Sequence, residues 1–203
     1  MSNEYNGYKK CFLDTETTGT DRKKNHIFQI SGAITDLDDN VIEKFDFRFR
    51  PHCILNVEDS ALEKTGMTAE KLRELPMSAA EAYAAFIAVL ERHCNRFDKK
   101  DKLQLVAYNA KFDDDFLREF FILHNDNYYG SWFWAPPICV MQMAAFFLID
   151  HRGALPNFKL GTLCEAAGLG WDESKAHDAE YDIRQTIRLY KYLRKNTRAL
   201  GES

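Results

Sequence analysis

Residues 11–19 read Cys-Phe-Leu-Asp-Thr-Glu-Thr-Thr-Gly, an apolar run that leads into two carboxylates, Asp14 and Glu16, and then into small hydroxyl residues and a glycine. Because side chains alternate along an extended segment, Asp14 and Glu16 share one face. Two like charges held side by side repel one another unless a cation lies between them. Oxygen ligands suit a hard ion such as Mg²⁺ or Mn²⁺. The alternative is a solvated strand end with two surface acids. The rest of the chain has to decide between this alternative and a metal site.

The length and composition predict one globular domain over residues 1–203. The chain is 45% hydrophobic and 29% charged, which is enough apolar material to bury a core. Its formal net charge of -4 gives no global basic signature. A nucleic acid could therefore bind only through local patches or through metal ions in an acidic cleft.

The cysteines and the N-terminus predict a soluble, cytoplasmic protein. The five cysteines are odd in number, widely spaced and without a Cys-x-x-Cys pair, which indicates reduced thiols rather than disulfides or a zinc site. The polar N-terminus lacks the apolar core of a secretory signal, and no apolar run approaches the about 20 residues that span a bilayer. We therefore expect no membrane partner.

The hydrophobic pattern predicts strands followed by helices, with one more strand between them. An antiparallel meander is expected at residues 8–13, 27–34 and 45–49, and a further interior strand at residues 103–107. Capping boxes at Ser60–Glu63 and Ser78–Glu81, and a short helix starting at Thr68, predict helices between residues 60 and 90. Later helices are expected to include residues 116–121, 138–149, 160–167 and 179–193.

Another acid follows the interior strand. Residues 109–113, Asn-Ala-Lys-Phe-Asp, link the end of that strand to the next helix. In open α/β sheets, ligands bind at the carboxyl ends of strands, where this segment and the two acids of the first strand would all lie. Asp113 is followed by two further acids, and any of the three could simply complement the helix dipole. We favour Asp113 because it is nearest the strand end.

The last helix opens with His177-Asp-Ala-Glu-Tyr-Asp182. Two helical side chains five residues apart point roughly 140° away from one another. His177 and Asp182 could therefore converge only if His177 lies on the loop before the helix. The alternative is that Asp178 is the N-cap and His177 an ordinary surface residue.

Together, these segments resemble the DEDD superfamily of 3′–5′ exonucleases, in its histidine-containing DEDDh (DnaQ-like) branch. Residues 12–19 resemble the first motif, residues 106–113 the second and residues 177–182 the third. The resemblance extends from Tyr8 to about Tyr190. It implies an α/β, ribonuclease H-like fold with a mixed five-stranded sheet and helices on both faces.

The resemblance also implies an activity. It implies metal-dependent hydrolysis of phosphodiester bonds at the 3′ ends of single-stranded DNA or RNA, with release of nucleoside 5′-monophosphates. Asp14, Glu16, Asp113 and Asp182 would hold two Mg²⁺ or Mn²⁺ ions, and His177 would be the general base.

Other positions would contact the substrate. Thr17 and Thr18 match positions beside the terminal nucleotide, where their backbone groups could hold its 3′ end. The remaining expected contacts are Phe28, Tyr108, Asn109 and Phe112. Two residues depart from those common in the branch, since Tyr108 stands where histidine is frequent and Gln29 where glutamate is frequent. A polymerase or a second copy of the chain is a further partner compatible with the resemblance.

Two other functions stay open. One is a non-catalytic or complex-dependent subunit of the same fold that binds nucleic acid or a polymerase, and the other is an endonuclease of the same broad fold. The aromatic residues at 128–134 could stack on bases, pack their own loop or dock a partner. Four basic residues of the last helix could contact phosphates or form a solvated face: Arg184, Arg188, Lys191 and Lys195.

Overall fold

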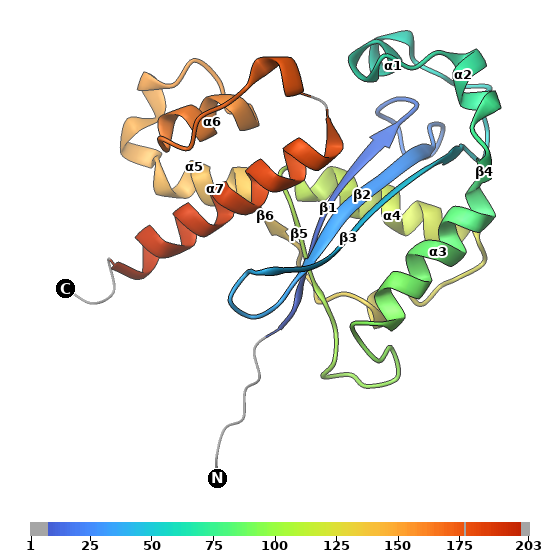
Figure 1. Ribbon diagram of the computed structural model, residues 1–203, viewed down its shortest axis with the longest axis horizontal. Coiled ribbons are helices and arrows are strands. Elements are labelled where there is room, and N and C mark those ends of the chain that lie inside the picture. The colour runs from blue at the N-terminus through green and yellow to red at the C-terminus, as the bar shows by residue number, and fades with distance from the viewer. Residues whose placement is uncertain (1–7, 177, 200–203) are drawn as a thin grey trace.

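The computed structural model describes residues 8–176 and 178–199, with side chains up to residue 196, and these form a mixed sheet with helices on both faces (Figure 1). The strands are β1 (Lys10–Thr17), β2 (Ile27–Thr35), β3 (Val41–Arg50), β4 (Met77–Ser78), β5 (Gln104–Ala107) and β6 (Ile138–Cys139). The α-helices are α1 (Asp59–Thr65), α2 (Ala69–Glu74), α3 (Ala79–Glu91), α4 (Ala110–Leu123), α5 (Val140–Phe147), α6 (Leu160–Ala166) and α7 (Ala179–Ala199). Short 3-10 turns lie at Tyr129–Ser131, Ile149–Ala154 and Glu173–Lys175.

Strand β1 lies inside the sheet because its sequence can be buried on both faces. Cys11, Phe12 and Leu13 are at most 1% exposed. It pairs antiparallel with β2 and parallel with β5, and the strand order is β4-β3-β2-β1-β5-β6. The carboxyl end of β1 therefore meets the carboxyl end of β5, where α4 begins.

Two apolar layers cover the sheet. On one face, α3 and α4 pack against it through a cluster that includes Phe86, Phe121 and Leu13. On the other face, a second cluster joins Phe12 of β1 to α5, α6 and α7, and the ring of Phe12 meets that of Tyr190 edge-on at 5.3 Å. Figure 1 shows α5, α6 and α7 together on that side. Because Phe12, Asp14 and Glu16 share a face of β1, both carboxylates lie on the side that α7 covers.

Most of the expected elements are present. The antiparallel meander of β1, β2 and β3 is confirmed, and the capping box at Ser78 is complete, with Glu81 bonded back to the Ser78 backbone. Thr68 caps α2, accepting a hydrogen bond from the Lys71 amide at 3.2 Å.

Three expectations need correction. The sheet has six strands rather than five, since two-residue strands β4 and β6 extend its edges. Residues 138–149 do not form one helix, because Ile138 and Cys139 pair with β5 and α5 ends at Phe147. The capping box expected at Ser60 is wrong: α1 begins one residue earlier, at Asp59, and its N-cap, Glu58, makes no side-chain cap bond.

No helix in the described part of the chain is long and apolar enough to cross a membrane.

Candidate active site

Asp113 is bonded to the end of β1 through Thr15, the residue between Asp14 and Glu16. It is 4% exposed, and its Oδ1 accepts hydrogen bonds from the Thr15 amide at 3.0 Å and from the Thr15 hydroxyl at 2.8 Å. Charged acceptors with two donors are strongly oriented. Asp113 is therefore fixed beside Asp14 and Glu16 although it is almost 100 residues away in the chain.

The two acids that follow Asp113 have other partners. Asp114 accepts a hydrogen bond from the Tyr129 hydroxyl at 2.6 Å and pairs with Arg118 at 2.7 Å. Asp115 pairs with Arg22 at 2.9 Å and with Lys111 at 2.7 Å. Of the three acids at the start of α4, it is thus Asp113 that joins the acids of β1.

Asp182 brings a fourth carboxylate from the first turns of α7. The pKa of Asp14 is raised well above its ordinary value, first by burial and then by the negative charges of Asp113, Glu16 and Asp182. Burial raises the pKa of Glu16 to about 7, and the charges of Asp182 and Asp113 act in the same direction. The four carboxylates therefore lie within each other's electrostatic field although β1, α4 and α7 supply them separately.

Burial is also the main reason why the pKa of Asp113 rises to about 7, and here the two hydrogen bonds from Thr15 act in the opposite direction. For Glu16, the opposing influence comes from the positive charges of Arg48 and Lys64. Asp14 and Glu16 are only half-buried by surface area, so solvent has some access to both side chains. Partly accessible acids whose pKa values are raised by one another are typical of a functional site rather than of a structural ion pair.

The chemistry of this donor set fits a hard divalent cation, since carboxylate oxygens are its preferred ligands and an ion would relieve the mutual repulsion. Within residues 8–176 and 178–199, however, no three His, Cys, Asp or Glu side chains are gathered closely enough to form a ready metal site. The chemistry of these donors thus supports the binding of a divalent cation.

The cleft beside Asp182 is a pocket of about 430 Å³. Its lining residues are Lys64, Tyr108, Lys159, Leu160, Gly161, Thr162, Glu165, Trp171, Glu173, Ala176 and Asp182. Tyr108, an expected substrate contact, is half-buried there and donates its hydroxyl to the carbonyl of Phe158. Trp171 lies over Gly161, where a Cβ would come within 2.7 Å of the indole ring. Sequence analysis did not single out Trp171, which lies in no recognisable motif, or Lys159, although residues 158–163 are a weaker part of the resemblance.

The other expected substrate residues are not all brought to the cleft. Asn109 is exposed where α4 begins, and Phe112 is partly buried against Phe116, with ring centroids 4.7 Å apart. Phe28 is 2% exposed and packs against Leu62 and Leu72, so it offers no face to a base in this arrangement.

Thr17 and Thr18 serve the loop that follows β1. The Thr17 hydroxyl donates to the carbonyl of Gly19 at 2.6 Å. The Thr18 amide donates to the carbonyl of His26 at 2.9 Å, and the Thr18 carbonyl accepts from the Glu58 amide at 2.8 Å. The backbone groups of Thr18, which we expected to hold the 3′ end, are therefore occupied by protein partners.

Position 177 lies outside the described residues, so the role expected for His177 stays a prediction. Its neighbours on each side are placed. Ala176 lines the pocket that contains Asp182, and the Asp178 carboxylate accepts a hydrogen bond from the Tyr181 amide at 2.8 Å at the start of α7. Asp178 thus caps the helix, as one of the two interpretations proposed.

A polar network of β2 and β3 lies beside the two acids of β1. Glu16 lies opposite Gln29, and Asp14 lies opposite Ser31. The Gln29 amide and the Ser31 hydroxyl each donate to Asp46 Oδ1 at 2.7 Å. Glutamine suits position 29 of this chain because it donates to Asp46, whereas a glutamate there would face two carboxylates, Glu16 and Asp46.

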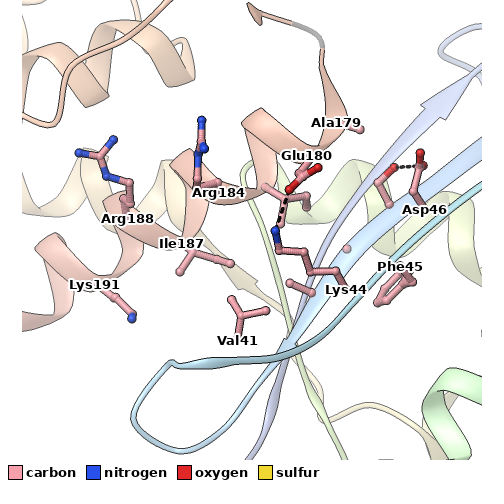
Figure 2. A pocket seen from close by; sticks show the side chains of 14 residues that line it. Val41, Lys44, Phe45, Asp46, Ala179, Glu180, Arg184, Ile187, Arg188 and Lys191 are labelled. Carbon is pink, nitrogen blue, oxygen red and sulfur yellow. Dashed lines mark hydrogen bonds and ion pairs between the residues drawn. The ribbon is translucent and has the colours of Figure 1, made fainter.

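A second hollow, of about 440 Å³, lies between α7 and the strands β2 and β3, beyond this network. Figure 2 shows Ile187 and Val41 on its two walls and the ion pair of Lys44 with Glu180, which measures 2.7 Å. Three of the basic residues singled out in the sequence lie along its α7 side: Arg184, Arg188 and Lys191. Their contact with phosphates stays a prediction.

Known proteins similar to this chain are exonucleases. The model of the RNase_T exonuclease family matches residues 11–190. The chain is 26% identical to ribonuclease T of Hahella chejuensis over 210 residues, which covers 99% of this chain and 90% of that protein. It is 22% identical to ribonuclease T of Haemophilus influenzae over 209 residues, or 99% of this chain and 86% of that protein.

Solved structures of E. coli exonuclease I are also similar. A zinc-bound complex with single-stranded DNA has a TM-score of 0.75 at 27% identity, over 97% of this chain and 42% of that one. A complex with a dA16 oligonucleotide has a TM-score of 0.75 at 26% identity, with the same coverage of 97% and 42%. The chain thus spans about two fifths of the length of exonuclease I.

Proposed function

This chain belongs to the RNase T family of exonucleases, and on that premise we propose that it removes nucleotides one at a time from the 3′ ends of single-stranded nucleic acid. The products would be nucleoside 5′-monophosphates. The observation that carries the proposal is the convergence of Asp14, Glu16, Asp113 and Asp182 at one end of the sheet. We propose further that residues 1–203 act as a single domain, which is supported by the contacts of α7 with both β1 and β2.

The four carboxylates would hold two divalent ions, with Mg²⁺ or Mn²⁺ favoured by their all-oxygen chemistry. The chemistry supplied by bound ions would be activation of a water and stabilisation of the negative charge that develops on the leaving 3′ oxygen. Thr15 would keep Asp113 oriented toward this site through its two hydrogen bonds. The positive charges of Arg48 and Lys64 would favour the ionised form of Glu16, since they oppose the rise of its pKa.

His177 would act as the general base that takes the proton of the attacking water. This role rests on the resemblance of residues 177–182 to the third motif. It is supported by the position of Ala176, the preceding residue, on the wall of the pocket that contains Asp182. A histidine on the loop before α7 would meet the condition set by the helix geometry.

The substrate would enter through the pocket beside Asp182, where Tyr108 and Trp171 offer aromatic surface and Lys64 and Lys159 offer positive charge. Such a combination suits bases and phosphates of a single strand. The relatives are named ribonuclease T, whereas the exonuclease I structures are complexes with DNA. Both RNA and DNA therefore have to be tested as substrates.

The test is digestion of matched 5′-labelled single-stranded DNA and RNA with Mg²⁺, with Mn²⁺ and with EDTA. We expect a one-nucleotide ladder with metal, none with EDTA, and none from the Asp14→Asn variant. The same oligonucleotides with a blocked 3′ end are the control, and they should stay intact. Internal cleavage of the blocked strand would identify an endonuclease instead. Binding without any cleavage would favour the non-catalytic subunit.

A further inference from the structure

The hollow of about 440 Å³ between α7 and the strands β2 and β3 is separate from the candidate active site (Figure 2). No residue that lines it also lines the pocket that contains Asp182. Helix α7 packs mainly over β1 and β2, so the outer strand β3 is less covered on this face. The lining residues that β2 contributes are small, Ser31, Gly32 and Ala33, and this leaves room above the sheet.

The walls of this hollow are mostly aliphatic. Ile183 and Ile187 line its α7 side, and Ala33 and Val41 line its sheet side. Val41 is 42% exposed, and the ring of Phe45, the one aromatic residue in the lining, is only 8% exposed. Bases of a single strand stack on open rings, which this lining does not offer. Open aliphatic walls suit the aliphatic side chains of a partner protein instead.

Positive charge follows the α7 side of the hollow. Arg184, Arg188 and Lys191 are exposed and lie four and three residues apart, so they share one stripe of the helix, which we call the α7 stripe. The Arg188 guanidinium donates to the Gln185 side chain at 2.7 Å, and the Arg184 guanidinium lies 5.2 Å from the ring centroid of Tyr181. Both arginines thus contact uncharged groups, which leave their positive charge in place.

The acids beside the α7 stripe have other partners. Of the two that line the hollow, Glu180 pairs with Lys44 at 2.7 Å. The other, Asp46, accepts hydrogen bonds from two side chains of β2 at 2.7 Å each and lies 3.7 Å from Arg48. The remaining ion pair of α7 lies further along the helix, at Arg194. The α7 stripe therefore forms no ion pair within the part of the chain that the structure describes.

From the aliphatic walls and the α7 stripe, we propose that this hollow is a docking site for an acidic segment of a partner protein that also carries aliphatic side chains. The aliphatic side chains enter between Ile187 and Val41, and the carboxylates pair with the α7 stripe. From Arg184 to Lys191 the stripe is about 10 Å long, which matches two turns of a helical segment or three residues of an extended one. A nucleic acid would meet the same charge but would leave the aliphatic walls uncovered.

Docking at this site leaves the candidate active site open. Helix α7 presents Asp182 to one pocket and Ile187 to the other, so a partner and a substrate can be bound at the same time. A partner held here would tether the enzyme rather than block it. The inference goes beyond the proposed function and does not depend on it.

Peptide binding provides the test. The affinity of the full chain is measured in EDTA, by fluorescence anisotropy, for labelled peptides of about 14 residues in which leucines are spaced two, three or four apart among aspartates and glutamates. We expect saturable binding of at least one spacing. The same peptide with serine in place of leucine should bind at least tenfold more weakly, and the peptide with lysine in place of the acids should not bind. Absence of saturable binding at every spacing would overturn the proposal.

The walls are tested with Val41→Asp, which places a negative charge in the hollow at an exposed position. We expect the affinity for the preferred peptide to fall at least tenfold. Ile122→Asp is the matched control, because this isoleucine is 52% exposed on α4, which covers the other face of the sheet, and its replacement should not change the affinity. Equal affinities of Val41→Asp and the wild type would overturn the proposal.

The charge is tested with the double variant Arg188→Ser, Lys191→Ser. We expect its affinity for the preferred peptide to fall about tenfold at low salt and to depend less on salt than that of the wild type. Lys99→Ser, Lys100→Ser is the matched control, since both lysines are exposed on the loop after α3 and their loss should have little effect. Equal losses in the two double variants would mean that the peptide responds only to net charge, which would overturn the site.

Two other occupants of the hollow are distinguished by the same samples. Displacement of the peptide by an equal concentration of a thymidine oligonucleotide would show that the α7 stripe binds nucleic acid. Dimerisation of the chain in sedimentation experiments, abolished by Val41→Asp, would show that a second copy occupies the hollow. Either result would overturn the proposal.

Discussion

Replacing Glu16 with glutamine should make the metal-free protein more stable while abolishing its activity. In the folded chain the pKa of Glu16 is raised from 4.5 to about 7, mainly by burial and then by the charges of Asp182 and Asp113. The folded state therefore holds a proton that the unfolded state releases in this pH range. The contribution of Glu16 to the free energy of unfolding is greatest below pH 4.5 and is lost as the pH rises to about 7. Glutamine cannot lose a proton, so the variant escapes this loss.

The size of the effect follows from the same pKa values. A rise from 4.5 to about 7 corresponds to at most about 3 kcal/mol, at 1.36 kcal/mol per pH unit. Solvent reduces this figure because Glu16 is only half-buried. Removal of Glu16 also takes away one of the charges that raise the pKa of Asp14, which acts in the same direction. We expect the variant to gain about 1–3 kcal/mol over the wild type at pH 8, and little at pH 4.5.

The assay is urea unfolding in EDTA at several pH values from 4.5 to 8, with wild type and Glu16→Gln measured side by side. Glu74→Gln is the matched control, because Glu74 is an exposed glutamate on α2 and should give no pH-dependent difference. The titrations are then repeated with Mg²⁺, which should stabilise the wild type by binding the folded state and stabilise the variant less.

A variant that is less stable than the wild type at pH 8, or a difference that does not change with pH, would refute the reasoning. Either result would mean that Glu16 is not under electrostatic strain in the metal-free protein. The assignment of the four carboxylates as a cation site would then lose its physical basis. If the Glu16→Gln variant were active at the wild-type rate, the assignment of Glu16 as a metal ligand would be wrong.

Three further changes have expected outcomes. Thr15→Val keeps the amide donor to Asp113 but removes the 2.8 Å hydroxyl bond, so turnover with Mg²⁺ should fall about tenfold in steady-state assays while thermal unfolding shows an intact fold. Gly32→Ala should cost about 2 kcal/mol or more in urea unfolding, because its Cβ would lie 2.5 Å from the carbonyl oxygen of Phe12, and unchanged stability would contradict this packing. His177→Ala should lower kcat by about 10² to 10⁴ with little change in Mg²⁺ affinity measured by calorimetry, and a normal kcat would exclude it as the base.

At the carboxyl end of β1, like charges are concentrated, which costs folding free energy and prepares a site for cations. There the chain departs from what stability alone would favour, and such a departure is expected at a functional site.

Local sequence determined much of the fold because the signals are local. Adjacent apolar residues at Cys11, Phe12 and Leu13 suit a strand buried on both faces, and alternation along β1 then puts Asp14 and Glu16 on one face. The Ser78 capping box was also readable, since both of its hydrogen bonds form within four residues, whereas the same pattern at Ser60 was wrong because α1 begins one residue earlier. The boundaries of short strands were not readable, because a two-residue strand such as β6 exists only through its neighbour β5.

The tertiary structure decided which side chains are brought to the candidate active site and which are buried elsewhere. Three adjacent acids open α4, and the contact of Asp113 with Thr15, which comes from a distant strand, distinguishes it from the other two. Phe28 was expected to face substrate, yet packing against Leu62 and Leu72 buries it. Arg96 meets Tyr128 only because the loops that follow α3 and α4 lie together. Periodicity and capping are fixed by neighbours along the chain, whereas burial, hydrogen-bond partners and electrostatic fields are fixed by neighbours in space.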